Sequence, residues 1–384
     1  MPFSHRIKSV EGSKSVGLAS LVAKLKNEGH DIIGLHVGEP DFPPPNEVIE
    51  ATQKALTDLQ VRYSLVPGIP ELREAIAHRF SSRSKRVVSL DNILISNGSK
   101  QILYNLFQCL INDGDEVIIP APYWVTFPES VKLAGGNPII VNSRDDLGLD
   151  LEAIEKAITP KTKMILFNTP NNPTSAVYGK EDLIKLGALA TKHDLIIIAD
   201  EAYESLVFEP NTHTSIAALS DDLFERTITV QTLSKSHCLT GFRIGYMIAP
   251  TKYVEEVSKL QSHLNGNVCT FAQHGALKAL TMDQTYFEEM IKTMSKRKDL
   301  AFKLTKEIFS CHEPQGAFYV FPSLDGYEGR FKSSAEAAEF ILREAKVAVL
   351  PGSAFGLEGY LRLSFASHED KIIEAFKRIK EALK

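Results

Sequence analysis

The sequence predicts an α/β fold with a mostly parallel sheet between two layers of helices. Short apolar runs alternate with longer segments of helical period. Within most of the apolar runs, polar residues do not alternate with the apolar ones. Strands of this kind are buried on both faces and occur in parallel sheets covered by helices. The 384 residues exceed the usual size of one compact core, so we expect two domains.

The N-terminal residues predict an arm followed by part of a small domain. Residues 1–16 are polar, and we expect them to be extended. A helix is predicted over about 18–27, because Gly29 suits a helix end. A short strand is predicted over 32–35. The prolines from Pro40 onwards forbid regular structure, so the first unit is expected to span residues 1–43.

The large domain is expected over residues 44–290 and begins with a helix at about 47–59. Helical segments separate seven predicted strands, which lie at 92–96, 116–120, 139–142, 164–168, 195–199, 227–230 and 244–249. A long helical region, about 251–309, then leads to the C-terminal segment. Residues 291–384 are expected to form a smaller α+β domain together with the N-terminal helix, so that this domain is built from both chain ends.

Composition excludes several classes of function. The net charge of −5 is spread along the chain, so no basic stripe predicts nucleic-acid binding. No apolar run reaches membrane-spanning length, and the first residues lack the apolar core of a signal peptide. The four cysteines are far apart and show no metal-ligand spacing. We therefore expect a cytoplasmic protein that binds no metal, membrane or nucleic acid.

A lysine and an arginine lie in a turn of small residues between two apolar runs. Such a lysine, Lys235, is a candidate for desolvation, which lowers the pKa of an amine and makes it a nucleophile that can form a Schiff base. The hydroxyls of Thr232 and Ser234, with the guanidinium of Arg243, suit a phosphate group. Taken alone, such a pair is more often two solvated charges on a surface loop, and it is the neighbouring motifs that favour the functional interpretation.

A second anion site is predicted where the strand at 92–96 ends. Gly98 and Ser99 form a turn of small residues before a helix at about 101–110, and the first N–H groups of a helix attract anions. The alternative is an ordinary tight turn that needs glycine. Lys100 is slightly unfavourable at a helix start, which suggests a ligand carboxylate nearby.

An aspartate and a tyrosine follow the very apolar strand at 195–199. A carboxylate such as Asp200 is costly to bury unless a cation pairs with it. Beside Lys235 and a phosphate site, the simplest partner is a protonated pyridine nitrogen. Tyr203 could then bond the hydroxyl oxygen of the same ring.

Three more side chains have two interpretations each. Trp124, the only tryptophan, could be a core residue or could stack on a cofactor ring. Asn172 could simply belong to a rigid turn between prolines, or its amide could bond a ring oxygen or a substrate carboxylate. Arg362 could pack its stem on an edge strand, or it could clamp an α-carboxylate with two hydrogen bonds.

Together these groups predict one cofactor, pyridoxal 5′-phosphate (PLP). Lys235 suits the aldehyde of PLP, and Asp200 suits its ring nitrogen. The helix start at Gly98 and Ser99, together with Arg243, suits its phosphate. The PLP ring accepts electrons, and the protein supplies orientation and electrostatics.

The order of the motifs resembles the class I and II aminotransferases of PLP fold type I, and most closely the bacterial aspartate aminotransferases of the aspartate/prephenate branch. The resemblance runs nearly end to end. It rests on Gly-Glu-Pro-Asp-Phe at 38–42, Arg-Tyr at 62–63, Pro-Tyr-Trp at 122–124, Pro-Asn-Asn-Pro-Thr at 170–174, Asp-Glu-Ala-Tyr at 200–203, Ser-Lys at 234–235, Gly-Phe-Arg-Ile-Gly-Tyr at 241–246, Gly-Ala-Phe-Tyr at 316–319 and Arg-Leu-Ser at 362–364.

The resemblance implies a role for each candidate residue. Lys235 would hold the cofactor as an internal aldimine and move the substrate proton, Asp200 would keep the ring nitrogen protonated, and Trp124 would stack on the ring. Ring and phosphate contacts would come from Tyr203, Asn172, Gly98, Ser99, Lys100, Thr232, Ser234, Arg243 and Tyr63 of the partner subunit. The family completes its active sites across a two-fold axis, so a homodimer is implied.

The resemblance also implies the substrates. Arg362, with Asn172 and the Gly38 backbone, would hold the α-carboxylate, and Trp124 would contact the substrate. Lys100, Ser13 and Ser15 match positions that read an acidic side chain, which favours transamination between L-aspartate and 2-oxoglutarate by a ping-pong mechanism. The alternatives are an aminotransferase for aromatic or other neutral amino acids and a PLP carbon–sulfur β-lyase. A non-catalytic PLP module is disfavoured by the intact Lys235, and a nicotinamide dehydrogenase by the lack of Gly-x-Gly-x-x-Gly after any strand.

Three positions depart from the family pattern. Ser175 replaces a glycine, Phe242 replaces a tryptophan, and residues 265–269 do not follow the expected sequence near the partner's site. Ser175 is expected to re-aim a turn, because serine tolerates the left-handed region poorly. The stretch 265–269 could change what the pocket accepts.

Overall fold

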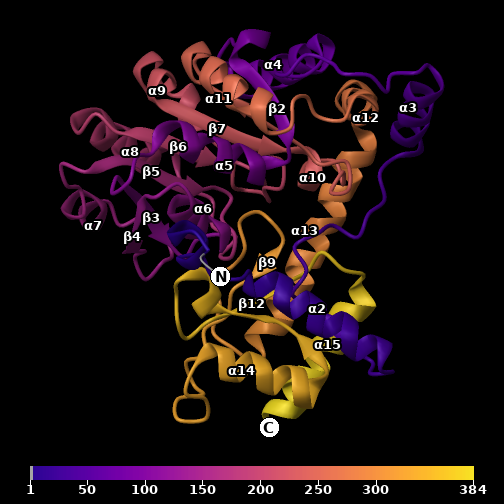
Figure 1. Ribbon diagram of the computed structural model, residues 1–384. Coiled ribbons are helices and arrows are strands. Elements are labelled where there is room, and N and C mark those ends of the chain that lie inside the picture. The colour runs from indigo at the N-terminus through magenta and orange to yellow at the C-terminus, as the bar shows by residue number, and fades with distance from the viewer. Residues whose placement is uncertain (1–2) are drawn as a thin grey trace.

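A seven-stranded sheet forms the centre of the upper lobe of the computed structural model, which describes residues 3–384 (Figure 1). Its strand order is β2-β8-β7-β6-β5-β3-β4. Only β8 runs antiparallel to its neighbours, so the sheet is mostly parallel. The strands are β2 (Ile93–Asn97), β3 (Glu116–Ala121), β4 (Asn137–Asn142), β5 (Thr162–Asn168), β6 (Ile196–Asp200), β7 (Thr227–Thr232) and β8 (Ile244–Ile248). All seven predicted strands are present.

Successive residues of these strands enter different cores, because side chains alternate across a strand. In β5, Met164 and Leu166 pack in one buried cluster with residues of α5 (Ser99–Leu110) and α11 (Thr251–Leu264). Ile165 and Phe167 pack on the other face with residues of α8 (Lys180–Lys192). Both faces are therefore covered, which explains the nearly continuous apolar runs in the sequence.

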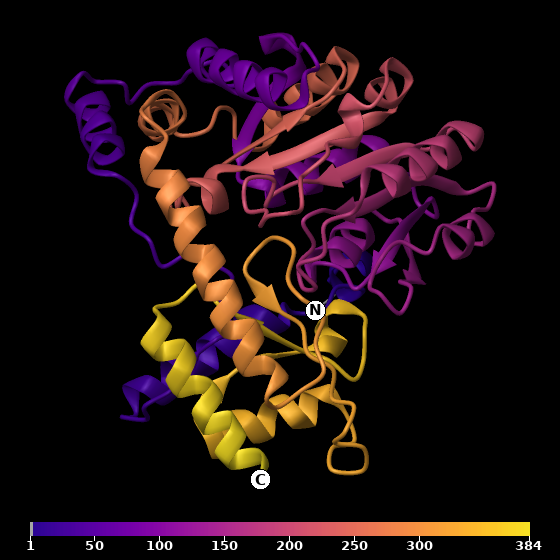
Figure 2. The same ribbon diagram turned by 180° about the vertical axis from the view of Figure 1, so that it is seen from behind.

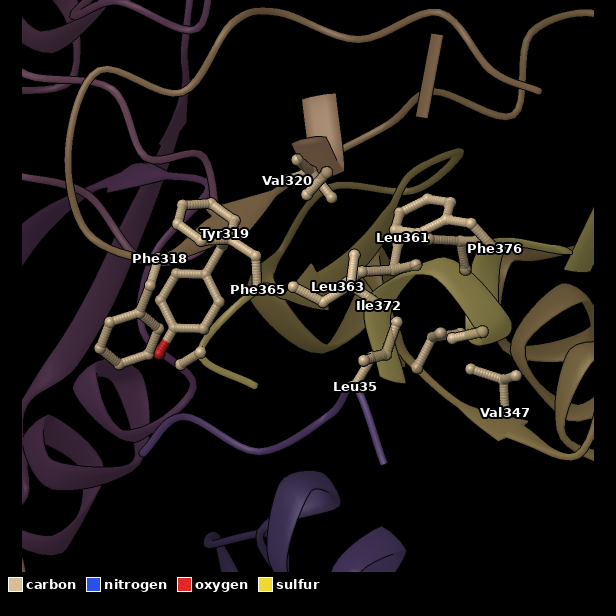
Figure 3. Close-up of a cluster of buried hydrophobic side chains, with 14 of the residues drawn as sticks. Leu35, Phe318, Tyr319, Val320, Val347, Leu361, Leu363, Phe365, Ile372 and Phe376 are labelled. Carbon is tan, nitrogen blue, oxygen red and sulfur yellow. The ribbon is translucent and has the colours of Figure 1, made fainter. Parts of the chain in front are cut away.

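The lower lobe is built from both chain ends. β1 (Ile33–Gly34) pairs in parallel with β10 (Val347–Ala348). β12 (Leu361–Ser364) lies between β11 (Leu350–Pro351) and β9 (Tyr319–Val320). Figure 3 shows Leu35 of the N-terminal segment beside residues of this C-terminal part, including Phe365 and Ile372, in one buried cluster.

The remaining helices cover the lobes and connect them. The long helix α13 extends from the upper lobe into the lower one (Figure 2), and α3 packs against α12. The helices not yet named are α1 (His5–Lys8), α2 (Lys14–Asn27), α3 (Asn46–Thr57), α4 (Pro70–Ser84), α6 (Thr126–Leu133), α7 (Leu151–Lys156), α9 (Asp221–Arg226), α10 (Leu233–Ser236), α12 (Thr270–Thr281), α13 (Thr285–Lys306), α14 (Ser334–Phe340) and α15 (Glu369–Leu383).

The extended arm predicted for residues 1–16 is wrong for half of the part that the structure describes. Residues 5–8 form α1, and α2 already begins at Lys14. The hydroxyl of Ser4 accepts a hydrogen bond from the Ile7 N–H at 3.3 Å, which caps α1. A polar segment can therefore be helical when a serine supplies the cap, a signal that apolar periodicity does not contain.

Between residues 3 and 384, no helix combines the length and the apolar composition that a membrane crossing requires.

Candidate active site

A cavity of about 280 Å³ lies where β5, β6 and β7 end, next to the start of α5. This is the edge at which open α/β sheets bind ligands. Predicted site residues from separate parts of the chain line it together: Gly38, Gly98, Ser99, Lys100, Trp124, Asn172, Asp200, Tyr203, Thr232, Ser234, Lys235 and Arg243. Asn168, Ala202 and Tyr319 line it too, although the sequence analysis did not single them out.

Lys235 lies in the short helix α10, directly after β7. Its Nζ donates a hydrogen bond of 2.5 Å to the carbonyl oxygen of Gly38. Burial lowers the pKa of Lys235 to about 8; the charge of Glu39 opposes this shift, and the charge of Arg362 adds to it. A substantial share of the amine is therefore unprotonated slightly above neutral pH, as a nucleophile requires.

Asp200 ends β6 and is 4% exposed. Burial, aided by the charge of Glu201, raises the pKa of Asp200 to about 7, although the Ala202 N–H donates to its Oδ1 at 3.1 Å. No ion pair neutralises Asp200 anywhere in residues 3–384. A buried carboxyl group in this state fits a ligand that carries its own positive charge, such as a protonated pyridine nitrogen.

The start of α5 forms a cradle for an anion. Gly98 caps the helix with φ +81°, and no side chain bonds the first N–H groups of α5. A Cβ at Gly98 would lie 2.5 Å from Nη2 of Arg243, so the guanidinium lies directly against this turn. Gly245 of β8 packs equally closely against the backbone of Gly98 and Ser99.

A second helix start contributes hydroxyls beside the first. Thr232 ends β7 and caps α10, because its Oγ1 accepts a hydrogen bond from the Ser234 N–H at 3.1 Å. The Ser234 hydroxyl lies 3.0 Å from the same oxygen. Helix N–H groups, hydroxyls and one guanidinium form a donor set that suits a phosphate dianion.

Arg362 lies in β12, the middle strand of its sheet, so the edge-strand alternative is wrong. The side chain is buried and donates hydrogen bonds to Asn172 Oδ1 at 2.9 Å and to the carbonyl oxygen of His36 at 2.6 Å. Its Nε has no partner within the described chain. Burial lowers the pKa of Arg362. A buried guanidinium with a free donor beside the cavity fits an anionic substrate group.

The residues predicted to read an acidic side chain are not all in one cavity. The Lys100 ammonium lies 5.1 Å from the centre of the half-buried Trp124 ring. Ser13 lines a neighbouring cavity of about 450 Å³ that shares Lys100 with the first one. Ser15 lines neither cavity, although its hydroxyl is 3.0 Å from that of Ser13.

Tyr63 does not line the cavity of its own chain. It is 96% exposed, so within one subunit it is almost fully accessible to solvent. This position leaves the side chain accessible to a second subunit.

The three departures from the family pattern have structural consequences. Ser175 adopts φ +62°, and its Oγ accepts a hydrogen bond of 3.1 Å from the Tyr319 N–H. Phe242 packs close to Gly275 of α12. In the stretch 265–269, Oδ1 of Asn265 accepts a hydrogen bond of 2.8 Å from Gln101 of α5.

Tyr319 is the main site residue that the sequence analysis missed. It is completely buried, and its hydroxyl lies 2.8 Å from that of Tyr203. The only signal was its place in Gly-Ala-Phe-Tyr, because a tyrosine in a short apolar strand otherwise predicts a core residue.

These residues fit PLP. The donor set for a phosphate, the buried carboxyl group of Asp200 and the enclosed amine of Lys235 meet in one cavity. They define the class of PLP-dependent enzymes of fold type I. The chain belongs to the aminotransferase class I and II family, whose sequence pattern matches residues 30–379.

Curated proteins and solved structures agree with this assignment. The chain is 39% identical over 386 residues to the probable aspartate/prephenate aminotransferase of Aquifex aeolicus, covering 99% of this chain and 98% of the relative. It is 38% identical to the aspartate aminotransferase of Bacillus subtilis, with the same coverage. The structure of Thermus thermophilus aspartate aminotransferase with maleate superposes with a TM-score of 0.95 at 35% identity over the full length of both chains.

The protein is therefore a PLP-dependent aminotransferase. These findings do not favour the β-lyase alternative.

Proposed function

We propose that this aminotransferase transfers the amino group of L-aspartate to 2-oxoglutarate in two half-reactions. The observation that carries the proposal is a pair of cationic side chains at the cavity, Arg362 beside it and Lys100 in its wall. Two cations suit the two carboxylates of a dicarboxylic substrate. The names of the Aquifex and Bacillus relatives and the dicarboxylate maleate in the Thermus structure support the same substrate class.

The proposed roles of the cofactor-side residues follow from their environment. When bound, PLP supplies an electrophilic carbon and an electron-accepting ring. Lys235 acts as the nucleophile and carries the proton taken from the substrate Cα, because its lowered pKa leaves the amine partly unprotonated. Asp200 would pair with the ring nitrogen, while Tyr203 and Asn172 would bond the ring oxygen.

The phosphate is assigned to the two helix starts and to Arg243, with Lys100 at the edge of this group. Their N–H groups, hydroxyls and guanidinium supply directed donors without moving. The contributing residues are Gly98, Ser99, Thr232, Ser234 and Arg243. Trp124, which lines the same cavity, would stack on the ring.

On the substrate side, Arg362 binds the α-carboxylate with Asn172 and the Gly38 backbone. Asn172 already accepts a hydrogen bond from Arg362, which fixes the guanidinium before substrate arrives. Lys100, with Ser13 and Ser15 of the N-terminal segment, reads the distal carboxylate. Because the two serines lie outside the cavity of the single chain, their role requires the N-terminal segment to move toward it.

Replacing Lys100 tests the substrate assignment. Lys100→Ala is expected to raise the KM for L-aspartate by about tenfold or more and to leave the KM for L-alanine within about twofold, because only aspartate has a second carboxylate. Lys132→Ala is the matched control, since Lys132 lines the neighbouring cavity and pairs with Glu129 at 2.9 Å. Equal changes of KM for both amino acids in Lys100→Ala would contradict the assignment.

The active enzyme is proposed to be a homodimer. The segment around Tyr63 presents apolar side chains to solvent, with Leu59 71% and Leu65 57% exposed, as a surface that awaits a partner would. In the dimer, Tyr63 of the partner subunit reaches the phosphate group.

We further propose that residues 1–43 and 291–384 form the small domain and residues 44–290 the large one. The support is the β1–β10 pair, which joins the two chain ends, and the passage of α13 between the lobes. A cytoplasmic location is proposed from the four widely spaced free cysteines.

A further inference from the structure

Tyr319 connects the two halves of the active site. It lies in β9, in the lower lobe, whereas Tyr203 follows β6 of the large sheet. Their hydroxyls are 2.8 Å apart and both side chains are buried. The two rings meet edge to face, with centroids 6.0 Å apart. The contact is therefore a hydrogen bond between two buried side chains in the wall of the cavity.

The same tyrosine also supports the arginine assigned to the substrate carboxylate. The guanidinium of Arg362 lies 4.3 Å from the centre of the Tyr319 ring. A cation held over an aromatic face is stabilised by the ring quadrupole, most strongly where water is excluded. One side chain thus contacts both Tyr203 and Arg362.

Both the backbone and the side chain of Tyr319 are held in place. Its N–H donates to Ser175 Oγ at 3.1 Å, and its hydroxyl is so near the Gly38 backbone that a Cβ at Gly38 would lie 2.7 Å from it. Tyr319 therefore has little freedom to change its position.

We propose that Tyr319 is a positioning residue, whose hydroxyl orients Tyr203 toward the cofactor ring and whose ring holds Arg362 in place for the substrate carboxylate. This proposal rests on the role assigned above to Tyr203. Tyr203 would donate a hydrogen bond to the ring oxygen, and its own oxygen could then accept a hydrogen bond from the Tyr319 hydroxyl. A hydrogen bond received in this way makes Tyr203 a stronger donor.

Spectroscopic titration separates this role from a structural one. The pH at which the visible absorbance of the PLP-loaded protein changes depends on how well negative charge on the ring oxygen is stabilised. The groups that face Tyr203 are Tyr319, Arg362 and Asp200, and only the first is altered in the test. Tyr319→Phe removes the hydroxyl and keeps the ring. The midpoint pH of this absorbance titration is therefore expected to rise by about 0.5 to 1 pH unit.

Two further variants make the result specific. Tyr203→Phe should raise the midpoint more than Tyr319→Phe, and Tyr203→Phe with Tyr319→Phe should titrate like Tyr203→Phe alone, because Tyr319 acts through Tyr203. Tyr246→Phe is the control for loss of a buried phenol, since its hydroxyl bonds Gln231 at 3.0 Å and lies outside the cavity. It should leave the midpoint unchanged.

Maleate binding tests the contact with Arg362 separately. The Kd of maleate should stay within about twofold in Tyr319→Phe, which keeps the ring, and rise by about tenfold in Tyr319→Leu, which removes it.

An unchanged midpoint in Tyr319→Phe, or shifts that add in the double variant, would overturn the role of the hydroxyl. If Tyr203→Phe itself titrates like the parent protein, the role of Tyr203 fails, and this proposal fails with it. Unchanged maleate binding in Tyr319→Leu would overturn the role of the ring.

Discussion

At the residue scale, burial acts on Asp200 and Lys235 in opposite directions. It raises the pKa of the acid to about 7 and lowers that of the amine to about 8, so both groups are held closer to their neutral forms. Without a ligand this arrangement costs stability. A cofactor that brings a cationic ring nitrogen to Asp200 and an electrophilic carbon to Lys235 relieves both costs, which links cofactor binding to folding.

The Asp200 environment predicts a pH-dependent stability of the cofactor-free protein. Its pKa is raised from 3.8 in the unfolded chain to about 7 in the folded one. The folded state therefore binds more protons between these values, and the free energy of unfolding contributed by Asp200 falls as pH rises from about 4 to about 7. Asp200→Asn, which does not titrate, should lack this fall.

The measurement is urea unfolding of both cofactor-free proteins between pH 5 and 7.5. The difference between them isolates Asp200, because His36, with a pKa lowered to about 4 by burial, contributes a rise over part of the same range in both. Parallel curves for the two proteins would show that Asp200 is already ionised without the cofactor.

Sequence alone predicted Asp200 because it directly follows a very apolar strand, where a charged group needs a reason to be buried. It predicted Lys235 because this lysine lies in a turn of small residues between two apolar runs. Tyr319 gave no such signal. A tyrosine beside valine and phenylalanine resembles an ordinary core residue, and its contact with Tyr203 joins positions 116 residues apart. Hydrogen bonds between distant elements have no local pattern in the sequence.

At the element scale, the anion site depends on how closely β8 approaches the start of α5. Gly245 lies against the peptide between Gly98 and Ser99, and a Cβ there would come within 2.8 Å of the Gly98 Cα and collide with the Ser99 nitrogen. The glycine is required for this approach, so the geometry of the helix start is set by a neighbouring strand.

Gly245→Ala is therefore expected to raise the Kd of PLP by about tenfold or more, because overpacking at this point costs about 1–3 kcal/mol and displaces the N–H groups that bind phosphate. Fluorescence titration of the cofactor-free protein with PLP measures it. Gly241→Ala, in the turn just before β8, is the matched control, since a Cβ there meets nothing within 4 Å. The same Kd for both variants would show that the approach of β8 does not shape the site.

The elements themselves were predicted better than their ends. The seven strands were recognisable because burial on both faces gives uninterrupted apolar runs. Helix α5 begins at Ser99, before the predicted start at 101, because Gly98 with φ +81° lets the chain turn directly from strand to helix. Helix α1 was missed because its four residues are all exposed and carry no apolar periodicity.

At the scale of the whole molecule, the two ends of the chain meet in one lobe, and the site lies where the lobes approach. Arg362 and Tyr319 come from the C-terminal part, whereas Lys235 and Asp200 come from the large sheet. Pairing between β1 and β10 spans more than three hundred residues of sequence, from Ile33 to Val347. Such long-range pairing was foreseen only in outline, as a small domain built from both ends.

The proposed homodimer predicts complementation between two defective variants. Lys235→Ala removes the proposed nucleophile of its own site, and Tyr63→Ala is expected to weaken cofactor binding in the neighbouring subunit's site. In a mixed dimer both defects fall in one site and the other is intact, so random mixing should leave about a quarter of all sites unaltered.

Activity is measured at a PLP concentration too low to load Tyr63→Ala. Subunits are exchanged by mild denaturation and refolding, and each variant refolded alone is the control. If the mixture is no more active than the average of the two controls, Tyr63 does not serve the partner's site.

The most direct test of the central claim is a visible spectrum of the PLP-loaded protein taken through both half-reactions. L-Aspartate is expected to change the absorbance of the bound cofactor, and 2-oxoglutarate is expected to restore it. Lys235→Ala should not complete this cycle, because it lacks the nucleophilic amine. A spectrum that L-aspartate leaves unchanged while a neutral amino acid converts it would contradict the assignment of the substrate.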